Sequence, residues 1–103
     1  QAADTAREIM ALFDKDRDAI KTLGRSGAAA FRVQEFLQRR PMMTIQAASR
    51  ELSLSVPTIG KAVEHLIDLG IVREMTGKRR NRLFSYSKYL SLLDRGTEPL
   101  PPG

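Results

Sequence analysis

Residues 44–86, TIQAASRELSLSVPTIGKAVEHLIDLGIVREMTGKRRNRLFSY, decide the fold of this chain. Two short helical patterns meet within this stretch at Ser53-Leu54-Ser55. In the second pattern apolar residues recur every three or four positions, and Gly70 supplies a left-handed stop. Two segments rich in branched and aromatic residues, 71–75 and 83–86, flank a polar loop and predict a pair of strands. The predicted order is helix, tight turn, helix and β-hairpin.

The N-caps of the two helices can be placed from the sequence. Thr44 suits the first helix, because its side-chain oxygen can accept a backbone N–H of the first turn. The second helix runs to about Leu69, and two caps are possible for it. Ser55 has the better capping side chain, whereas Val56 as the cap would put Pro57 at its favoured first helical position. The sequence leaves these two alternatives open.

The remainder of the chain is also predicted to be mainly helical. Asp4 is the expected N-cap of a long first helix that runs to about Ile20. Two glycines within residues 24–27 end that helix, and a second helix follows over about 28–39, before Pro41. A last helical turn or two is expected from four residues: Tyr89, Leu90, Leu92 and Leu93.

These elements predict a mainly α fold with a small two-stranded β wing, namely a winged helix-turn-helix preceded by a long N-terminal connector helix. The chain divides into a connector helix and break (1–27), the winged helix-turn-helix domain (28–93) and a flexible tail (94–103). Its 103 residues leave room for one modest core. No segment approaches the ~20 apolar residues of a membrane span, so we expect no membrane partner.

Composition limits the chemistry further. The chain contains no cysteine, which excludes disulfides and thiolates and fits a cytoplasmic protein. It starts at Gln1 rather than Met, so we expect it to be cut from a longer protein, and no signal peptide is visible. With one histidine and scattered helical acids, neither a catalytic triad nor a metal site can be assembled. We therefore predict no catalytic and no metal-ligating residues.

Positive charge is concentrated in one part of the chain. The formal net charge is +5, and residues 71–90 hold six basic side chains against one acid, Glu74. Four of the six lie in the loop between the predicted strands: Lys78, Arg79, Arg80 and Arg82. A focused cationic patch attracts polyanions, and a wing can meet the phosphate backbone of DNA. These four residues are the candidate DNA contacts of the wing, and a merely solvated loop is the alternative.

The outer face of the second helix is the other candidate DNA-binding surface. Four residues spaced by three or four share one stripe: Thr58, Lys61, His65 and Asp68. Base contacts in this motif come mainly from the start of the helix, which favours Thr58 and Lys61. Ser55 can donate to a phosphate, and His65 is interpreted as a surface residue or a DNA contact. Glu64 and Asp68 indicate that only the first two turns approach DNA.

Residues 58–72, TIGKAVEHLIDLGIV, are followed by TGKRRNR at 76–82. These two segments resemble the C-terminal winged-helix region of bacterial Fic family proteins. Residues 4–17, together with Leu23-Gly24-Arg25, resemble the helical connector that precedes that region in the family. Phe36-Leu37 and Arg40-Pro41 do so too, and the resemblance extends over about residues 4–93.

The resemblance implies a parent protein that transfers AMP from ATP to hydroxyl side chains of target proteins. The catalytic motifs His-Pro-Phe and Gly-Asn-Gly-Arg are absent from this chain, as is the Ser/Thr-x-x-x-Glu-Gly/Asn pattern of the inhibitory helix. We therefore expect no enzyme activity and no cofactor in this fragment, with ATP implied for the missing catalytic domain. One departure is Ser53, where related turns often carry glycine. A positive φ there would cost a serine some conformational energy.

Two functions fit these observations. The leading one is a winged helix that binds double-stranded DNA and guides or regulates the Fic catalytic domain of the same chain, as a bacterial transcription regulator would. The alternative is a protein-interaction or dimerisation module, such as one that forms a homodimer, that positions the catalytic domain or its target without binding DNA. The acids Glu64 and Asp68 motivate the alternative, as do Phe13 and Ile20 of the first helix, which are expected to need a partner surface.

Overall fold

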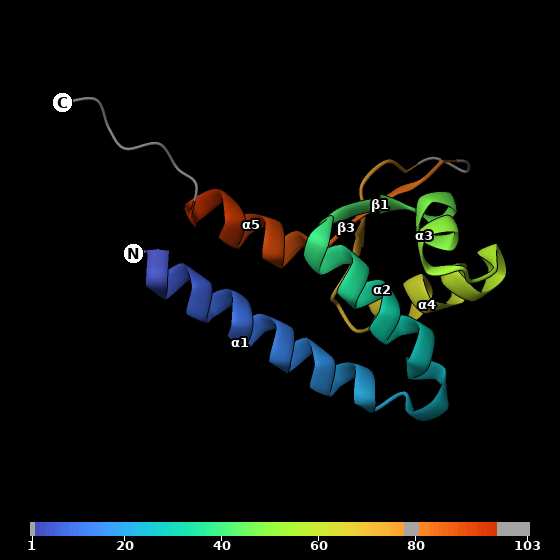
Figure 1. Ribbon diagram of the computed structural model, residues 1–103, viewed down its shortest axis with the longest axis horizontal. Helices are drawn as coiled ribbons and strands as arrows, with labels where there is room; N and C mark the ends of the chain where they lie inside the picture. The colour runs from blue at the N-terminus through green and yellow to red at the C-terminus, as the bar shows by residue number, and fades with distance from the viewer. Residues whose placement is uncertain (1, 78–80, 97–103) are drawn as a thin grey trace.

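Five α-helices and three short strands make up the described part of the chain, residues 2–77 and 81–96 of the computed structural model (Figure 1). In chain order they are α1 (Ala2–Lys21), the 3-10 turn η1 (Gly24–Ser26), α2 (Gly27–Arg39), β1 (Met42–Thr44), α3 (Ile45–Leu52), α4 (Val56–Asp68), β2 (Arg73–Glu74), β3 (Leu83–Ser85) and α5 (Ser87–Gly96). The predicted fold class, mainly α with a small β wing, is confirmed. Residues 94–96, predicted as part of a flexible tail, belong to α5, which extends to Gly96, and residues 97–103 lie outside the described part.

Helices α2, α3 and α4 pack around one core. Each contributes fully buried apolar side chains: Val33 and Leu37 from α2, Ala48 and Leu52 from α3, and Ile59, Ala62, Val63 and Leu66 from α4. Burial of each larger side chain in this set contributes about 1.5–3 kcal/mol. The core therefore fixes which side of α4 faces inward and leaves its opposite side exposed.

Both predicted caps of this unit are present. The Thr44 hydroxyl accepts the Ala47 N–H at 3.2 Å. The Ser55 hydroxyl accepts the Thr58 N–H at 3.2 Å, so Ser55 is the N-cap of α4 and Val56 its first helical residue. Val56 is therefore not the cap. Its side chain has no acceptor, whereas the Ser55 hydroxyl satisfies the Thr58 amide, which has no partner within the helix.

The sheet has one strand more than the sequence predicted. Its order is β1-β3-β2, all antiparallel, with Met43 opposite Phe84 on one side of β3 and Glu74 opposite Phe84 on the other. The two-stranded wing was thus an incomplete prediction. The three residues of β1 follow a proline and end at the helix cap Thr44, so they are too few to show strand periodicity, and β1 exists because β3 lies alongside it.

The first predicted strand of the wing is shorter than expected. Ile71 and Val72 are buried, but their N–H groups bond to the Leu66 carbonyl at 2.9 and 3.2 Å. Gly70, at φ +76°, turns the chain back onto α4 in the left-handed conformation that was predicted. These amides therefore close the end of α4 instead of joining the sheet.

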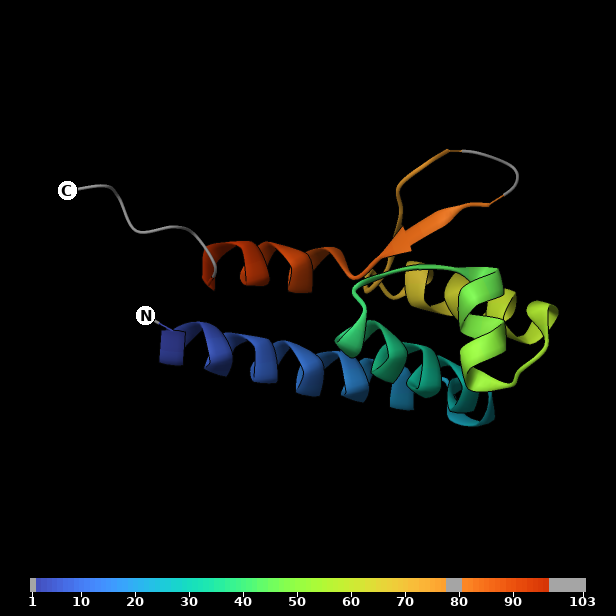
Figure 2. The same ribbon diagram turned by 45° about the horizontal axis from the view of Figure 1, so that its top comes forward.

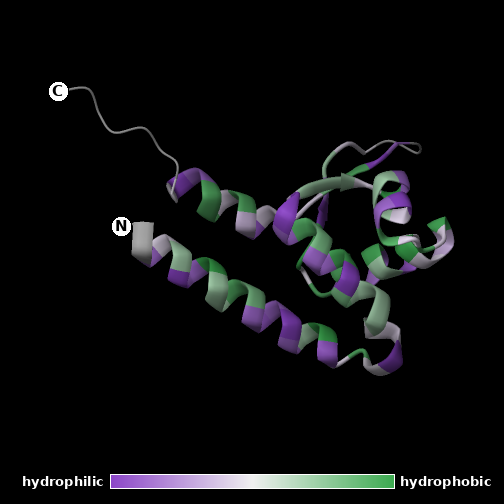
Figure 3. Ribbon diagram, in the orientation of Figure 1, coloured by the Kyte–Doolittle hydropathy of each residue, from purple (hydrophilic) through white to green (hydrophobic). Residues whose placement is uncertain are grey.

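Helices α1 and α5 lie side by side and antiparallel, and the two ends of the described chain are on the same side of the molecule (Figures 1 and 2). The predicted N-cap is wrong, because α1 begins at Ala2 and Asp4 lies within its first turn. An ion pair joins Arg95 to Glu8 across the two helices. Polar and apolar residues are interspersed along α1, as Figure 3 shows, and this mixture suits a helix covered on one side.

The apolar residues of α1 are covered by the chain itself. Ile20 is fully buried, and the Phe13 ring packs edge-on against Tyr89 with centroids 4.8 Å apart. Phe13 also lies 5.6 Å from the Tyr86 ring. The expectation that Phe13 and Ile20 need an external partner is therefore wrong, because α2 and α5 provide the surface that a partner would have supplied.

A buried polar network joins α1, α2 and the junction between β3 and α5. The Tyr86 hydroxyl, whose residue is 0% exposed, donates to Asp16 Oδ2 at 2.7 Å. Gln34 Nε2 donates to the Tyr86 hydroxyl at 3.3 Å and to the Phe13 carbonyl at 3.2 Å. Burial, opposed by the Gln34 hydrogen bond and reinforced by Asp16, raises the pKa of Tyr86 well above its usual range. The network therefore holds the tyrosine in its neutral, donating form.

We expect Tyr86→Phe to destabilise the fold by about 2–3 kcal/mol, because it deprives a buried carboxylate of its donor. Tyr89→Phe is the matched control, since it removes a neutral bond to the Gln38 carbonyl and costs about 1 kcal/mol. Urea unfolding at neutral pH measures both.

A comparison of wild type with Tyr86→Phe tests the raised pKa of Tyr86. The unfolded chain releases the tyrosine proton near pH 10.0 while the folded chain keeps it, so stability is complete below pH 10 and falls above it. The free energy of unfolding of wild type should therefore fall steadily as the pH rises above 10, and that of Tyr86→Phe should fall less. Parallel pH profiles would contradict the network.

The turn between α3 and α4 contains a serine in the left-handed conformation. Ser53 has φ 54° and ψ 41° and is exposed. The Ser49 hydroxyl donates to the Leu54 carbonyl, and the Leu54 N–H bonds to the Ser49 carbonyl at 3.2 Å, which fixes the turn around it. The position thus has the positive φ for which glycine is better suited.

Ser53→Gly should stabilise the chain by about 0.5–1 kcal/mol, because relief of about 1–2 kcal/mol of left-handed strain exceeds the added entropy of an unfolded glycine. Thermal unfolding should show a midpoint a few degrees higher. Ser53→Ala retains the Cβ and should leave the midpoint unchanged. An equal gain in both variants would mean that the strain is not the cause.

Candidate nucleic-acid interface

The start of α4 presents two hydroxyl groups that are already bonded to each other. The Ser55 hydroxyl donates to Thr58 Oγ1 at 2.8 Å while it caps the helix. Its single proton is therefore directed to Thr58, and the Thr58 hydroxyl keeps a proton that can be donated outward. Both residues are exposed. Of the two predicted contacts, Thr58 is the available donor and Ser55 is the residue that orients it.

Three of the predicted α4 residues border one groove. The groove has a volume of about 390 Å³ and lies between α4 and the start of α2. Its lining residues are Arg25, Ser26, Ala28, Ala29, Thr58, Lys61, Ala62 and His65. Lys61 is exposed and His65 is half-buried, so the stripe expected from the helical spacing is formed as a surface. We call this surface the α2–α4 groove.

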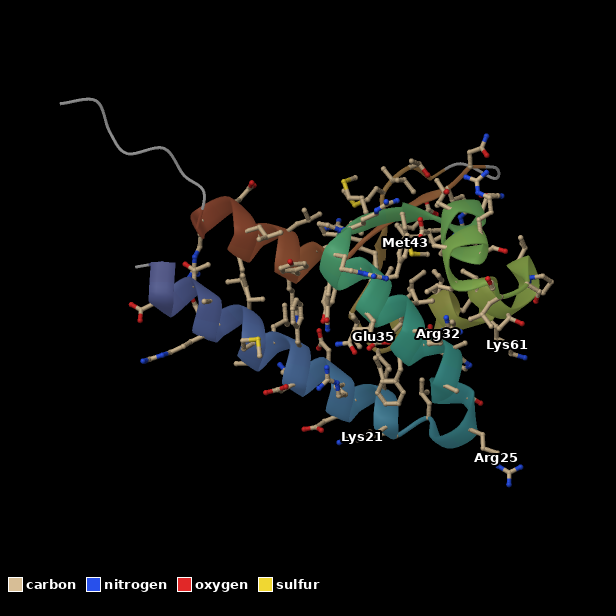
Figure 4. The ribbon with its side chains drawn as sticks, viewed as in Figure 1. Lys21, Arg25, Arg32, Glu35, Met43 and Lys61 are labelled. Carbon is tan, nitrogen blue, oxygen red and sulfur yellow. The ribbon has the colours of Figure 1, made fainter. Side chains whose placement is uncertain are left out.

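Arg25 is the site residue that sequence reasoning missed. It lies in η1, in the break between α1 and α2, and is exposed. Figure 4 shows Arg25 and Lys61 at the same end of the molecule, with the Arg25 guanidinium directed into solvent. The sequence showed a basic residue between two glycines. Arg25 lies next to α4 because α2 packs on α4, and the local periodicity of the sequence does not predict this packing.

The acidic residues of α4 lie on its outer face. Glu64 and Asp68 are exposed and stand one and two turns beyond Lys61. Ile59 and Val63, on the opposite side, are buried. The arrangement agrees with the expectation that the first two turns of α4, rather than its whole length, are suited to a polyanion.

Arg82 is held inside the wing by two partners. Its Nε and one terminal nitrogen donate to Glu74 Oε1 at 3.2 and 3.0 Å. Its guanidinium also stacks over the Phe84 ring, 5.1 Å from the centroid. Arg82 was predicted as a DNA contact, and in the structure it ties the two strands of the wing together. The other predicted wing contacts, Lys78, Arg79 and Arg80, lie outside the described residues.

Glu74 organises the base of the wing loop. Its Oε2 accepts the Thr76 N–H and the Thr76 hydroxyl, each at 3.1 Å, and the Gly77 N–H. The Gly77 N–H, followed by Arg82 and Thr76, lowers the pKa of Glu74 below its ordinary value of 4.5, against the effect of burial. The Thr76 hydroxyl in turn accepts the Leu83 N–H at 3.3 Å. One carboxylate therefore sets the conformation from which the basic loop departs.

The described residues contain neither a cluster of metal ligands nor a helix that could span a membrane. Within residues 2–77 and 81–96, no three His, Asp or Glu side chains converge as metal ligands would. No helix in these ranges combines the length and apolarity needed to cross a bilayer.

The sequence matches no protein-family model and no curated protein. The resemblance to Fic proteins therefore stays a prediction carried by the residues of 58–72 and 76–82.

We expect Glu74→Gln to loosen the wing without unfolding the chain, because a neutral amide replaces the charged acceptor of the Gly77 and Thr76 amides. Hydrogen exchange should be faster at both amides. In wild type the contribution of Glu74 is complete above pH 4.5 and is lost as the pH falls through the lowered pKa, so protection should disappear only in more acidic solution.

Glu35→Gln, on the exposed side of α2, is the control for the loss of one negative charge. It should leave exchange at Thr76 and Gly77 unchanged. Equal effects of the two variants would show that Glu74 acts through general charge instead of through its hydrogen bonds.

Proposed function

We propose that this chain is a DNA-binding winged-helix domain that inserts the start of α4 into a major groove. The observation that carries the proposal is the division of α4 into two sides. Its apolar side is buried against α2 and α3, and its first two turns expose Thr58 and Lys61. A capped helix fixed in this way can present side chains to base edges with little loss of conformational freedom on binding.

The chemistry of the exposed side suits this role. Lys61 can bind a guanine edge or a phosphate, and the Thr58 hydroxyl can donate to either. The loop of the wing contains three more basic residues, for which we propose contacts to the phosphate backbone: Lys78, Arg79 and Arg80. Glu74 and Arg82 support the contribution of the wing by giving its base a defined conformation.

We further propose that the domain belongs to a bacterial Fic-type protein that transfers AMP, and that it guides or regulates the catalytic domain of the same chain in the cytoplasm. The support is the resemblance of residues 58–72 and 76–82. Under this proposal ATP and the catalytic motifs belong to the other domain, and this fragment contributes binding.

A protein-interaction or dimerisation module is the second candidate. The observation in its favour is a mainly apolar hollow of about 460 Å³ between α1 and α5, to which Ala11, Leu12 and Leu92 contribute. Met10, elsewhere on α1, is 60% exposed. Sedimentation over a range of concentrations gives the oligomeric state. Together with a DNA titration it separates the two candidates, because a monomer that binds duplex DNA fits the first and a dimer that does not bind DNA fits the second.

Titration of a labelled duplex tests the proposed function. If the chain neutralises about four phosphates, log K should fall with log salt at a slope near −3 to −4. Arg80→Ala should reduce the magnitude of that slope by about one. Arg7→Ala, which changes an exposed arginine on α1, should leave the slope as it is. Absence of binding by wild type at low salt would contradict the proposal.

A further inference from the structure

The α2–α4 groove differs in charge from three other hollows of the described structure. Its lining contains Arg25, Lys61 and His65 and no acidic side chain. Glu51 lines the hollows beside Arg40, and Glu8 lines the hollow between α1 and α5. In those three places a carboxylate accompanies the cations, and both acids are themselves paired, with Arg40 and Arg95. Among the described residues, the lining of the α2–α4 groove has cations and no acidic side chain.

The two principal cations of the groove come from different elements. Arg25 belongs to η1 and Lys61 to α4, so the groove collects positive charge from segments 36 residues apart in sequence. No ion pair that involves either side chain is found within residues 2–77 and 81–96. Unpaired cations on two sides of a hollow create a positive potential between them, which favours an anionic ligand.

The other lining groups fit an oxyanion. The Thr58 hydroxyl has a proton free to donate, and the Ser26 hydroxyl borders the same space. Ala28 and Ala29 form the floor toward α2, and their small side chains leave the volume open. An arginine fork, an ammonium group and hydroxyl donors are the groups that bind phosphate oxygens in proteins. A carboxylate-bearing peptide would match the charge but would need fewer donors.

We propose that the α2–α4 groove binds a phosphate group, held between Arg25 of η1 and Lys61 of α4. The inference rests on the proposed function, under which the phosphate belongs to the DNA backbone beside the major groove that receives α4. Arg25 is then a DNA contact outside both the recognition helix and the wing. It restricts the angle at which α4 enters the major groove, because Arg25 belongs to η1 and contacts the backbone from outside α4.

Duplex titrations with three variants test this inference. Arg25→Ala should weaken binding roughly tenfold at low salt and reduce the magnitude of the salt slope by about one, the value for one lost phosphate contact. Arg25→Lys keeps the charge and should retain the slope. Ala28→Leu fills the groove without changing the net charge and should weaken binding as well. Arg7→Ala, with the same change in charge on exposed α1, should behave as wild type.

The outcomes distinguish failure of the groove proposal from failure of the proposed function. If wild type binds DNA and both Arg25→Ala and Ala28→Leu leave affinity and slope unchanged, the groove proposal is overturned and the function stands. If wild type does not bind DNA, the function fails, and inorganic phosphate replaces the duplex as the probe. His65 ring resonances that shift with phosphate in wild type, and not in Arg25→Ala, would support a groove for a free phosphorylated ligand. Unshifted resonances would overturn the groove as well.

Discussion

The hydrogen bond from the Tyr86 hydroxyl to Asp16 is the interaction on which the arrangement of the helices depends. It joins residues 70 positions apart and draws α1 against the junction of β3 and α5. The Tyr86 N–H bonds to the Pro41 carbonyl, and Gln34 supplies the second side-chain partner. A buried carboxylate without a donor would cost about 2–3 kcal/mol. The geometry that satisfies Asp16 therefore determines how α1, α2 and α5 lie together.

The site depends on this arrangement indirectly. Because α1 is fixed against α2, the break at residues 24–27 is also fixed, and Arg25 comes to lie at the end of α2 that contacts α4. The core between α2 and α4 then sets the rotation of α4, so that Thr58, Lys61 and His65 face the same groove. A basic surface assembled from two elements in this way is more rigid than a basic loop, and less of its binding free energy is lost to ordering.

The wing illustrates that a basic residue of a charged loop can have a structural role. The basic loop contains four cations, and Arg82 is bonded to Glu74 and stacked on Phe84. Sequence spacing cannot distinguish Arg82 from its neighbours, because the distinction arises from the pairing of β2 with β3. The wing strands were predicted from their composition, whereas β1 was missed because its three residues acquire strand geometry through contact with β3.

The sequence by itself determined the features that depend on near neighbours. These are the cap at Thr44, the left-handed stop at Gly70 and the apolar side of α4. Each follows from backbone sterics or helical period within a few residues. The tertiary structure decided the rest: the third strand, the partners of Asp16 and Arg82, and the meeting of Arg25 with α4. Those features join residues that are distant in the chain, and packing of the shared core, rather than local conformation, brings them together.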